Sequence, residues 1–125
     1  MTFKSELPVS GMKRIEAIVK ADKLDKVVYS LKAAGVGGIT ITQSHGVGAG
    51  QRPVIEDSRG TSRHEAEFNT LNTVITIVDD SKVGTVVSAI IDAAHTGNRG
   101  DGKIFVTNVE EAFDIATKES GRNII

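Results

Sequence analysis

A glycine-rich segment in the last third of the chain has the composition of an anion-binding loop. It reads TGNRGDGKIFV from Thr96 to Val106. Glycines at positions 97, 100 and 102 allow backbone N–H groups to turn toward an anion without a Cβ in the way. Lys103 adds a fixed positive charge, and Arg99 supplies a second. This combination predicts a phosphate-binding loop, and the simpler alternative is a tight glycine turn with a solvated lysine.

The same segment does not fit the P-loop of nucleotide hydrolases. Residues 97–103 spell GxxxxGK, but a P-loop requires Ser or Thr at the next position, where this sequence has Ile104. A P-loop also runs from a strand into a helix, whereas the apolar patterns here predict a helix before the segment and a strand after it. We therefore do not expect Walker-type ATP hydrolysis.

Other residues that could do chemistry form no catalytic pattern. The chain has no cysteine, which excludes disulfides, thiolate zinc sites and cysteine nucleophiles. Its three histidines, His45, His64 and His95, lack the spacing of metal ligands. The carboxylates of residues 56–67 fit a solvated loop surface better than a metal or acid–base site. With no GxSxG nucleophile motif either, we expect no enzymatic activity and no metal site.

Length and charge restrict the class of protein further. The 125 residues suit a single domain, and a net charge of −1 gives no basic excess for binding nucleic acid or a membrane surface. No apolar run is long enough for a signal peptide or a membrane span, so we expect a cytoplasmic protein without direct membrane insertion. Residues 1–11 are predicted to be a flexible leader and residues 118–125 a mobile tail.

The first half of the chain predicts a strand, a helix and a second strand. A strand begins at Met12 and runs to about residue 19. Asp22 is the expected N-cap of a helix whose apolar face is formed by residues 24, 27, 28 and 31, and Gly35 is expected to end it. The β-branched run at 39–42 predicts the second strand.

Residues 46–70 show no periodic pattern, which is typical of a functional or disordered loop, although a helix near residues 62–68 is an alternative. A β-branched strand follows at 73–78, with a helix N-cap at Asp79, Asp80 or Ser81. The apolar stripe over 83–94 predicts the second helix. Residues 103–106 form the next strand, followed by a helical turn at 109–112 and a short edge strand at 113–116.

The element order β-α-β-β-α-β predicts one α+β domain over residues 12–117 with the ferredoxin-like arrangement. In this arrangement a four-stranded antiparallel sheet carries both helices on one face. The strands are apolar on nearly all sides, so the second face of the sheet also needs a cover. We expect self-association to provide it.

Three local sequences resemble the PII signal-transduction family. They are KxxKLDxV at residues 20–27, GVG at residues 46–48, and the run at residues 96–106, which matches the family's B-loop pattern TGxxGDGKIFV at every fixed position. The resemblance covers residues 12–113. It implies a homotrimer with adenine nucleotide sites between subunits, a B-loop at 96–103, and a T-loop at about 46–70 that docks onto a target protein.

The resemblance also implies which residues bind the nucleotide. Strands one and two would contribute Ile18, Gly38 and Thr40 to the adenosine pocket. The loop segments would contribute Gly46, Val47, Gly48, Arg99, Gly100, Asp101, Gly102 and Lys103.

The T-loop departs from the family pattern GFGRQKG. Here Gly50 follows an apparent one-residue insertion, so that Gln51 and Arg52 would match the glutamine and lysine of the pattern. In members that bind 2-oxoglutarate, that glutamine helps to hold Mg²⁺ and the effector. The lysine expected at the far base of the loop is absent, and so is the T-loop tyrosine that is uridylylated in many members. Weaker 2-oxoglutarate binding is implied, with bicarbonate as a second effector of inorganic-carbon-linked relatives.

The C-terminal departure concerns the phosphates. The family pattern RxRTGE supplies two arginines to them, but this chain has Asp114 and Ala116 at the arginine positions. Because a triphosphate carries more negative charge than a diphosphate, we expect ADP or AMP to be favoured over ATP. Two alternatives stay open: a nitrogen regulator that responds to 2-oxoglutarate, and a trimeric scaffold of the CutA-like architecture without a nucleotide.

Overall fold

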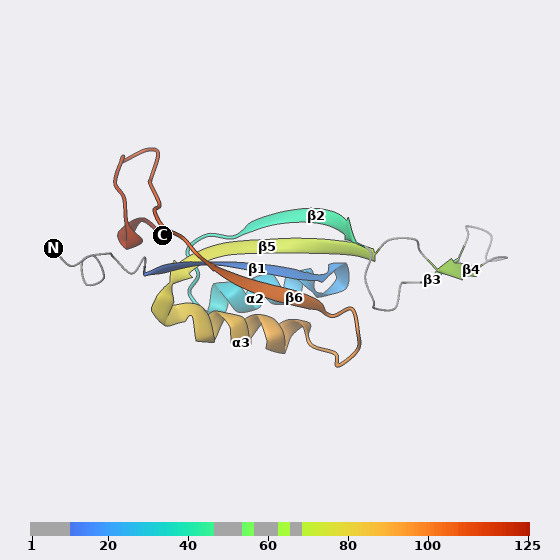
Figure 1. Ribbon diagram of the computed structural model, residues 1–125. Coiled ribbons are helices and arrows are strands. Elements are labelled where there is room, and N and C mark those ends of the chain that lie inside the picture. Colours follow the sequence, from blue (N-terminus) through green and yellow to red (C-terminus); the bar gives the residue numbers. More distant parts are fainter. Residues whose placement is uncertain (1–10, 47–53, 57–62, 66–68) are drawn as a thin grey trace.

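The computed structural model of the chain describes residues 11–46, 54–56, 63–65 and 69–125. In this part a four-stranded sheet carries two α-helices on one face (Figure 1). All its neighbouring strands are antiparallel, in the order β2-β5-β1-β6. The strands are β1 (Met12–Lys20), β2 (Thr40–Gly46), β5 (Asn69–Asp79) and β6 (Gly102–Asn108). The predicted ferredoxin-like fold is therefore confirmed.

Each α-helix is entered through a short 3-10 turn. The turn η1 (Ala21–Lys23) leads into α2 (Leu24–Ala33), and η2 (Asp80–Lys82) leads into α3 (Val83–Ala94). The predicted N-cap at Asp22 is wrong, because this residue lies inside η1 and the N-cap residue of α2 is Lys23. Asp79 does act as a cap, but for η2, where its carboxylate accepts a hydrogen bond from the N–H of Ser81.

Gly35 ends α2, as predicted from the sequence. Its φ of +83° lies in the left-handed region that favours glycine. The N–H of Gly35 donates to the carbonyl of Lys32, and the N–H of Val36 donates to the carbonyl of Leu31. This pair of bonds is the Schellman arrangement, which satisfies carbonyl groups that the end of the helix leaves without partners.

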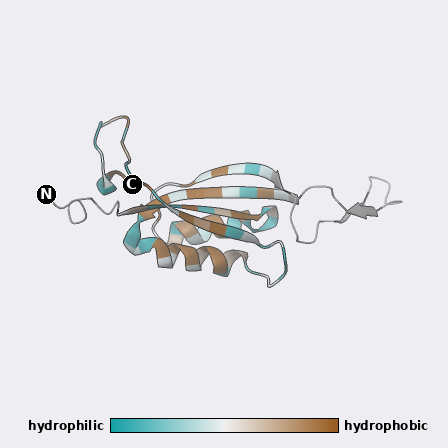
Figure 2. Cartoon of the chain, viewed as in Figure 1, coloured by the Kyte–Doolittle hydropathy of each residue, from teal (hydrophilic) through white to brown (hydrophobic). Residues whose placement is uncertain are grey.

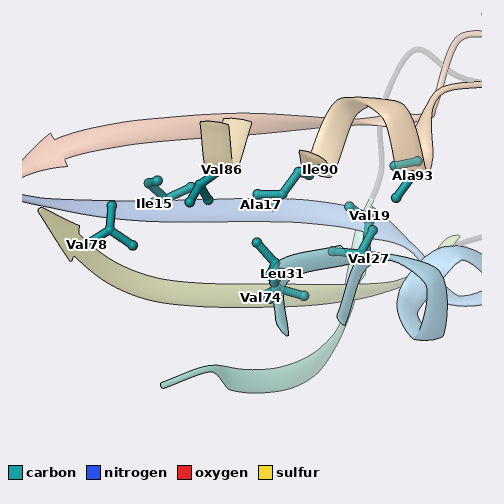
Figure 3. Close-up of a cluster of buried hydrophobic side chains, with 11 residues drawn as sticks. Ile15, Ala17, Val19, Val27, Leu31, Val74, Val78, Val86, Ile90 and Ala93 are labelled. Atoms are coloured by element: carbon teal, nitrogen blue, oxygen red, sulfur yellow. The ribbon is translucent and has the colours of Figure 1, made fainter. Parts of the chain in front are cut away.

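The core lies between the helices and the helix-facing side of the sheet (Figure 3). Alternate residues of β1 and β5 point into it, and the stripe of α3 that the sequence predicted supplies Val86 and Ile90. Burial of these side chains provides the main stabilising free energy. The cluster comprises Ile15, Ala17, Val19, Val27, Leu31, Val74, Val78, Val86, Ile90, Ala93 and Ala94.

Two short strands lie within the segment between β2 and β5. They are β3 (Val54–Glu56) and β4 (Arg63–Glu65), which pair with each other in an antiparallel ladder. The alternative of a helix near residues 62–68 is therefore wrong at 63–65. Both strands are short, and one contains β-branched residues while the other is charged. Such a short pair shows no alternating pattern that could be recognised in the sequence.

The chain after β6 differs from the sequence prediction. Residues 109–112 form no helical turn, and the N–H of Val109 instead donates to the carbonyl of Met12, prolonging the pairing with β1. The predicted edge strand at 113–116 is also wrong, because only an isolated bridge joins Phe113 to Ser120. Residues 115–117 form a turn, organised by Asp114.

The last residues pack against the domain. They end in the 3-10 turn η3 (Arg122–Ile124), and the guanidinium of Arg122 pairs with the carboxylate of Asp79 at 3.1 Å. The side chain of Arg122 also lies against Gly11. The predicted tail thus has a defined place, while its mobility stays a prediction, and residues 1–10 of the predicted leader lie outside the described part. No helix in the described part is long and apolar enough to cross a membrane.

Candidate functional site

The predicted phosphate-binding loop connects α3 to β6, and hydrophilic residues dominate it (Figure 2). At its start His95 leaves the helix with φ −70° and ψ 130°, while its N–H still donates to the carbonyl of Ile91. At its end Gly102 pairs with Val19 of β1. Both ends of the loop are therefore fixed by regular structure.

Asp101 holds the loop in shape from inside. Its carboxylate accepts hydrogen bonds from the backbone N–H groups of Thr96, at 2.6 Å, and Gly97, at 3.0 Å, and from the Thr96 hydroxyl. That hydroxyl oxygen in turn accepts from the N–H of Asn98. The carboxylate and the Thr96 hydroxyl thus occupy the N–H groups of residues 96–98, which leaves residues 99–103 as the part that can face a ligand.

The charge of Asp101 is itself balanced. The hydrogen bonds from the Thr96 hydroxyl and N–H hold the pKa of the Asp101 carboxyl well below its usual range, so it is ionised at neutral pH. The ammonium of Lys20, at the end of β1, lies 3.4 Å from this carboxylate. The pair reduces the negative field that Asp101 would otherwise direct at a bound anion.

The two cations predicted to meet phosphate remain available. In the part of the chain that the structure describes, neither Arg99 nor Lys103 forms an ion pair, and both are exposed. Lys103 lies opposite Ile18 in the β1–β6 ladder. Because alternate residues of a strand share one face, Lys103 and Ile18 lie together on the sheet face that the helices leave open.

Gly102 makes the close approach of the loop to β1 possible. Its φ is +119°, and a Cβ built on it would lie 1.8 Å from the backbone carbonyl oxygen of Ile18. No side chain fits there. Gly97 and Gly100 also have positive φ values, +90° and +91°. The glycines that the sequence analysis selected are therefore required by the path of this loop, whether or not a ligand is bound.

Six of the predicted nucleotide-binding residues of the described part line two clefts, whereas Arg99 and Gly100 line neither. One cleft, of about 380 Å³, is lined by Ile18, Asp101, Gly102 and Lys103 together with apolar residues of α3. A second cleft, of about 580 Å³, is lined by Gly38 and Thr40 with residues of β5 and the C-terminus.

The two clefts share no residue, and they belong to opposite edges of the sheet, because β2 and β6 are its outer strands. Gly46, the last residue of β2, pairs with Asn69. The remaining predicted residues, Val47, Gly48, Gly50, Gln51 and Arg52, lie outside the described residues.

Asp114, which replaces an arginine of the family pattern, is committed to a turn. Its carboxylate accepts hydrogen bonds of 2.9 Å from the N–H groups of both Ala116 and Thr117. The bond from the Thr117 N–H contributes most to a lowered pKa of the Asp114 carboxyl. The position that would carry a phosphate-binding guanidinium is thus occupied by an anion with a local structural role.

Sequence reasoning missed the contributions of Thr96 and Lys20. Both lie within the quoted motifs, but their side chains organise Asp101 and were assigned no role. The spacing of Thr96 from Asp101, with glycine between them, was the available signal for a carboxylate that caps its own loop. No group of three or more His, Asp or Glu side chains in the described ranges is placed to bind a metal ion.

Comparison with known proteins agrees with this arrangement. The family model "Nitrogen regulatory protein P-II" matches residues 12–119. Similar proteins include the nitrogen regulatory protein P-II of Azospirillum brasilense, 44% identical, and that of Rhizobium meliloti, 43% identical; each alignment covers 91% of this chain and 100% of the relative. The nitrogen regulatory protein P-II 2 of Methanothermobacter thermautotrophicus is 39% identical over 91% of this chain and 97% of its own.

The family model and these relatives, rather than the fold alone, place the chain among the signal-transduction regulators. The chain belongs to the P-II nitrogen regulatory protein family. Proteins of this family are regulators rather than enzymes, and they are trimeric.

Proposed function

We propose that the protein is a trimeric P-II-type regulator that senses adenine nucleotides, with ADP or AMP favoured over ATP. It controls a transporter or an enzyme through the segment at residues 46–70. The observation that carries the proposal is the loop at 96–103, in which Asp101 and Lys20 fix the backbone while Arg99 and Lys103 stay exposed and unpaired within the described part of the chain. Fixed N–H groups beside two cations suit a di- or triphosphate.

The separation of the two clefts supports a site between subunits. Gly38 and Thr40 belong to one edge of the sheet and the phosphate loop to the other. In a trimer the β2 edge of one subunit meets the loop of its neighbour, and the two halves close around one nucleotide. The open face of the sheet carries Ile75, Ile77 and the half-exposed Phe105, which give the trimer an apolar surface to bury.

The preference for ADP or AMP rests on the missing guanidinium groups. Each charge-assisted hydrogen bond to a phosphate is worth roughly 1.5–3 kcal/mol. Ala116 provides none, and the ionised Asp114 repels the additional charge of ATP. The absence of lysine between Lys32 and Lys82 disfavours 2-oxoglutarate as the second ligand, so bicarbonate, a monoanion, is the proposed effector.

A calorimetric titration tests the proposal. AMP, ADP and ATP are titrated into the wild-type protein, each with and without bicarbonate or 2-oxoglutarate. Lys103→Ala should weaken ADP binding by at least tenfold, because a charge-assisted contact of roughly 1.5–3 kcal/mol is lost. Lys26→Ala removes an exposed lysine on α2 that lines neither cleft, and it is the matched control.

Each result has one meaning. Binding of ADP or AMP at least as tight as that of ATP supports the proposal, and an effect of bicarbonate adds the carbon-linked effector. If 2-oxoglutarate rather than bicarbonate changes nucleotide binding, the result favours the alternative of a nitrogen regulator. No heat with any nucleotide refutes the sensing function and favours the CutA-like scaffold.

A further inference from the structure

The sheet face that the helices leave open carries an ion pair flanked by uncharged residues. The guanidinium of Arg14 lies 3.1 Å from the carboxylate of Glu16, two residues further along β1. Both side chains lie on the open face, because they alternate with the buried residues 15 and 17. Their direct neighbours on β5 and β6 are all uncharged, namely Ile75, Ile77, Phe105 and Thr107.

In a single subunit this pair contributes little to stability. The side chains of Arg14 and Glu16 are 37% and 29% exposed, so water screens both charges. The environment of the pair changes when a neighbouring subunit covers the face. Proteins of the family are trimeric, and the pair lies between Ile75 and Phe105, which are part of the apolar surface that the trimer is proposed to bury. Covering this surface removes water from both charges of the pair.

A second copy of this chain is the partner that fits such a face. One N–H of the Arg14 guanidinium donates to one oxygen of the Glu16 carboxylate, and among the described residues neither group has a further hydrogen bond. The other N–H groups and the second oxygen therefore need partners once water is excluded. Another copy presents the same guanidinium and the same carboxylate and can supply both kinds of partner, whereas an entirely apolar surface can supply neither.

We infer that the Arg14–Glu16 pair lies inside the subunit interface and selects which subunits associate. The inference rests on the proposed function, because it places the open face in the trimer. The pair provides selectivity rather than strength, since the desolvation of buried charges offsets most of their attraction. A subunit with an unmatched charge at either position is excluded, while a second copy of this chain is accepted. Because the proposed nucleotide site forms between subunits, the pair also determines which chains share a site.

The first test removes one charge. Glu16→Gln keeps the size of the side chain but leaves the guanidinium of Arg14 without its carboxylate in the covered face. Sedimentation of the nucleotide-free protein over a range of concentrations should show that the midpoint of trimer dissociation rises by roughly tenfold or more.

Asp80→Asn is the matched control for this test. The Lys13–Asp80 pair is comparable, with a distance of 2.8 Å and side chains that are 25% and 34% exposed. Lys13, however, shares the helix-facing side of β1 with the buried Ile15, so this pair lies away from the open face. The control should dissociate as the wild type does.

The second test restores the match between different chains. Arg14→Glu gives each subunit two neighbouring carboxylates, and Glu16→Arg gives it two neighbouring guanidinium groups. Each variant alone should sediment as a monomer that keeps the helical circular dichroism of the wild type, because like charges would meet in the interface. A mixture of the two variants should form trimers again, and native mass spectrometry should find both chains in them.

Three results would overturn the inference. They are a Glu16→Gln protein that dissociates no more readily than Asp80→Asn, a charge-reversal variant that forms trimers on its own, and a mixture that stays monomeric. None of them depends on nucleotide, so ADP binding to the wild type still decides the sensing function separately. A wild-type protein that is itself monomeric would refute the trimeric regulator, and the inference would fail with it.

Discussion

Replacing Gly102 by alanine should destabilise the protein by about 3 kcal/mol. The left-handed backbone at φ +119° costs a residue with a Cβ roughly 1–3 kcal/mol. The new Cβ would also lie 1.8 Å from the carbonyl oxygen of Ile18, which is backbone and cannot rotate away. β6 must then move off β1 at this end, and each ladder hydrogen bond lost adds roughly 1 kcal/mol.

Urea unfolding at a fixed protein concentration measures this effect, since subunit association would otherwise change the apparent stability. Gly84→Ala is the matched control, because Gly84 lies in α3 with nothing within 4 Å of a built Cβ. Alanine in a helix is favoured over glycine by roughly 0.5–1 kcal/mol, so the control should be at least as stable as the wild type. A Gly102→Ala protein within 0.5 kcal/mol of the wild type would refute the reasoning.

Three further results are expected. Asp101→Asn should lose part of the acid dependence of stability, which urea unfolding at pH 2–7 detects. Because folding lowers the pKa of the Asp101 carboxyl, the carboxylate stabilises the wild type at pH values above the ordinary pKa of 3.8, and this contribution is lost as the pH falls below that value. Leu31→Ala, at a fully buried position, should cost about 3 kcal/mol of unfolding free energy. Deleting residues 51–68 should leave the trimer intact in sedimentation, because β2 and β5 keep their pairing, but abolish capture of a target protein; sedimentation as a monomer would make the segment structural.

The regular elements were predictable because local patterns and tertiary packing agree. The β-branched run at 73–78 and the apolar stripe at 83–94 each bury the face that their periodicity selects, in β5 and α3. The glycine loop was predictable for a related reason. A position such as Gly102 admits no other residue, so the glycine in the sequence directly indicates the close backbone approach at this position.

The incorrect predictions from the sequence also have physical causes. Asp22 has the residue type of an N-cap, but the chain enters α2 through a 3-10 turn, which moves the cap to Lys23. The region after β6 was misassigned because Asp114 forms an Asx-type turn that depends on two N–H groups rather than on apolar spacing. The position of Ile124 and Ile125 beside Gly37 depends on long-range packing, which no local pattern encodes.

Strand β5 determines how the domain bears mechanical load. Gly46 and Asn69, where the chain enters and leaves the segment between β2 and β5, are paired neighbours at one end of the sheet. A force on this segment along the strand axis therefore acts on β2 and β5 in the same direction. The hydrogen-bonded ladder between β5 and all nine residues of β1 resists this force in shear. Those hydrogen bonds bear the force at the same time rather than one after another. The domain should therefore stay folded when a bound partner exerts a force on the segment.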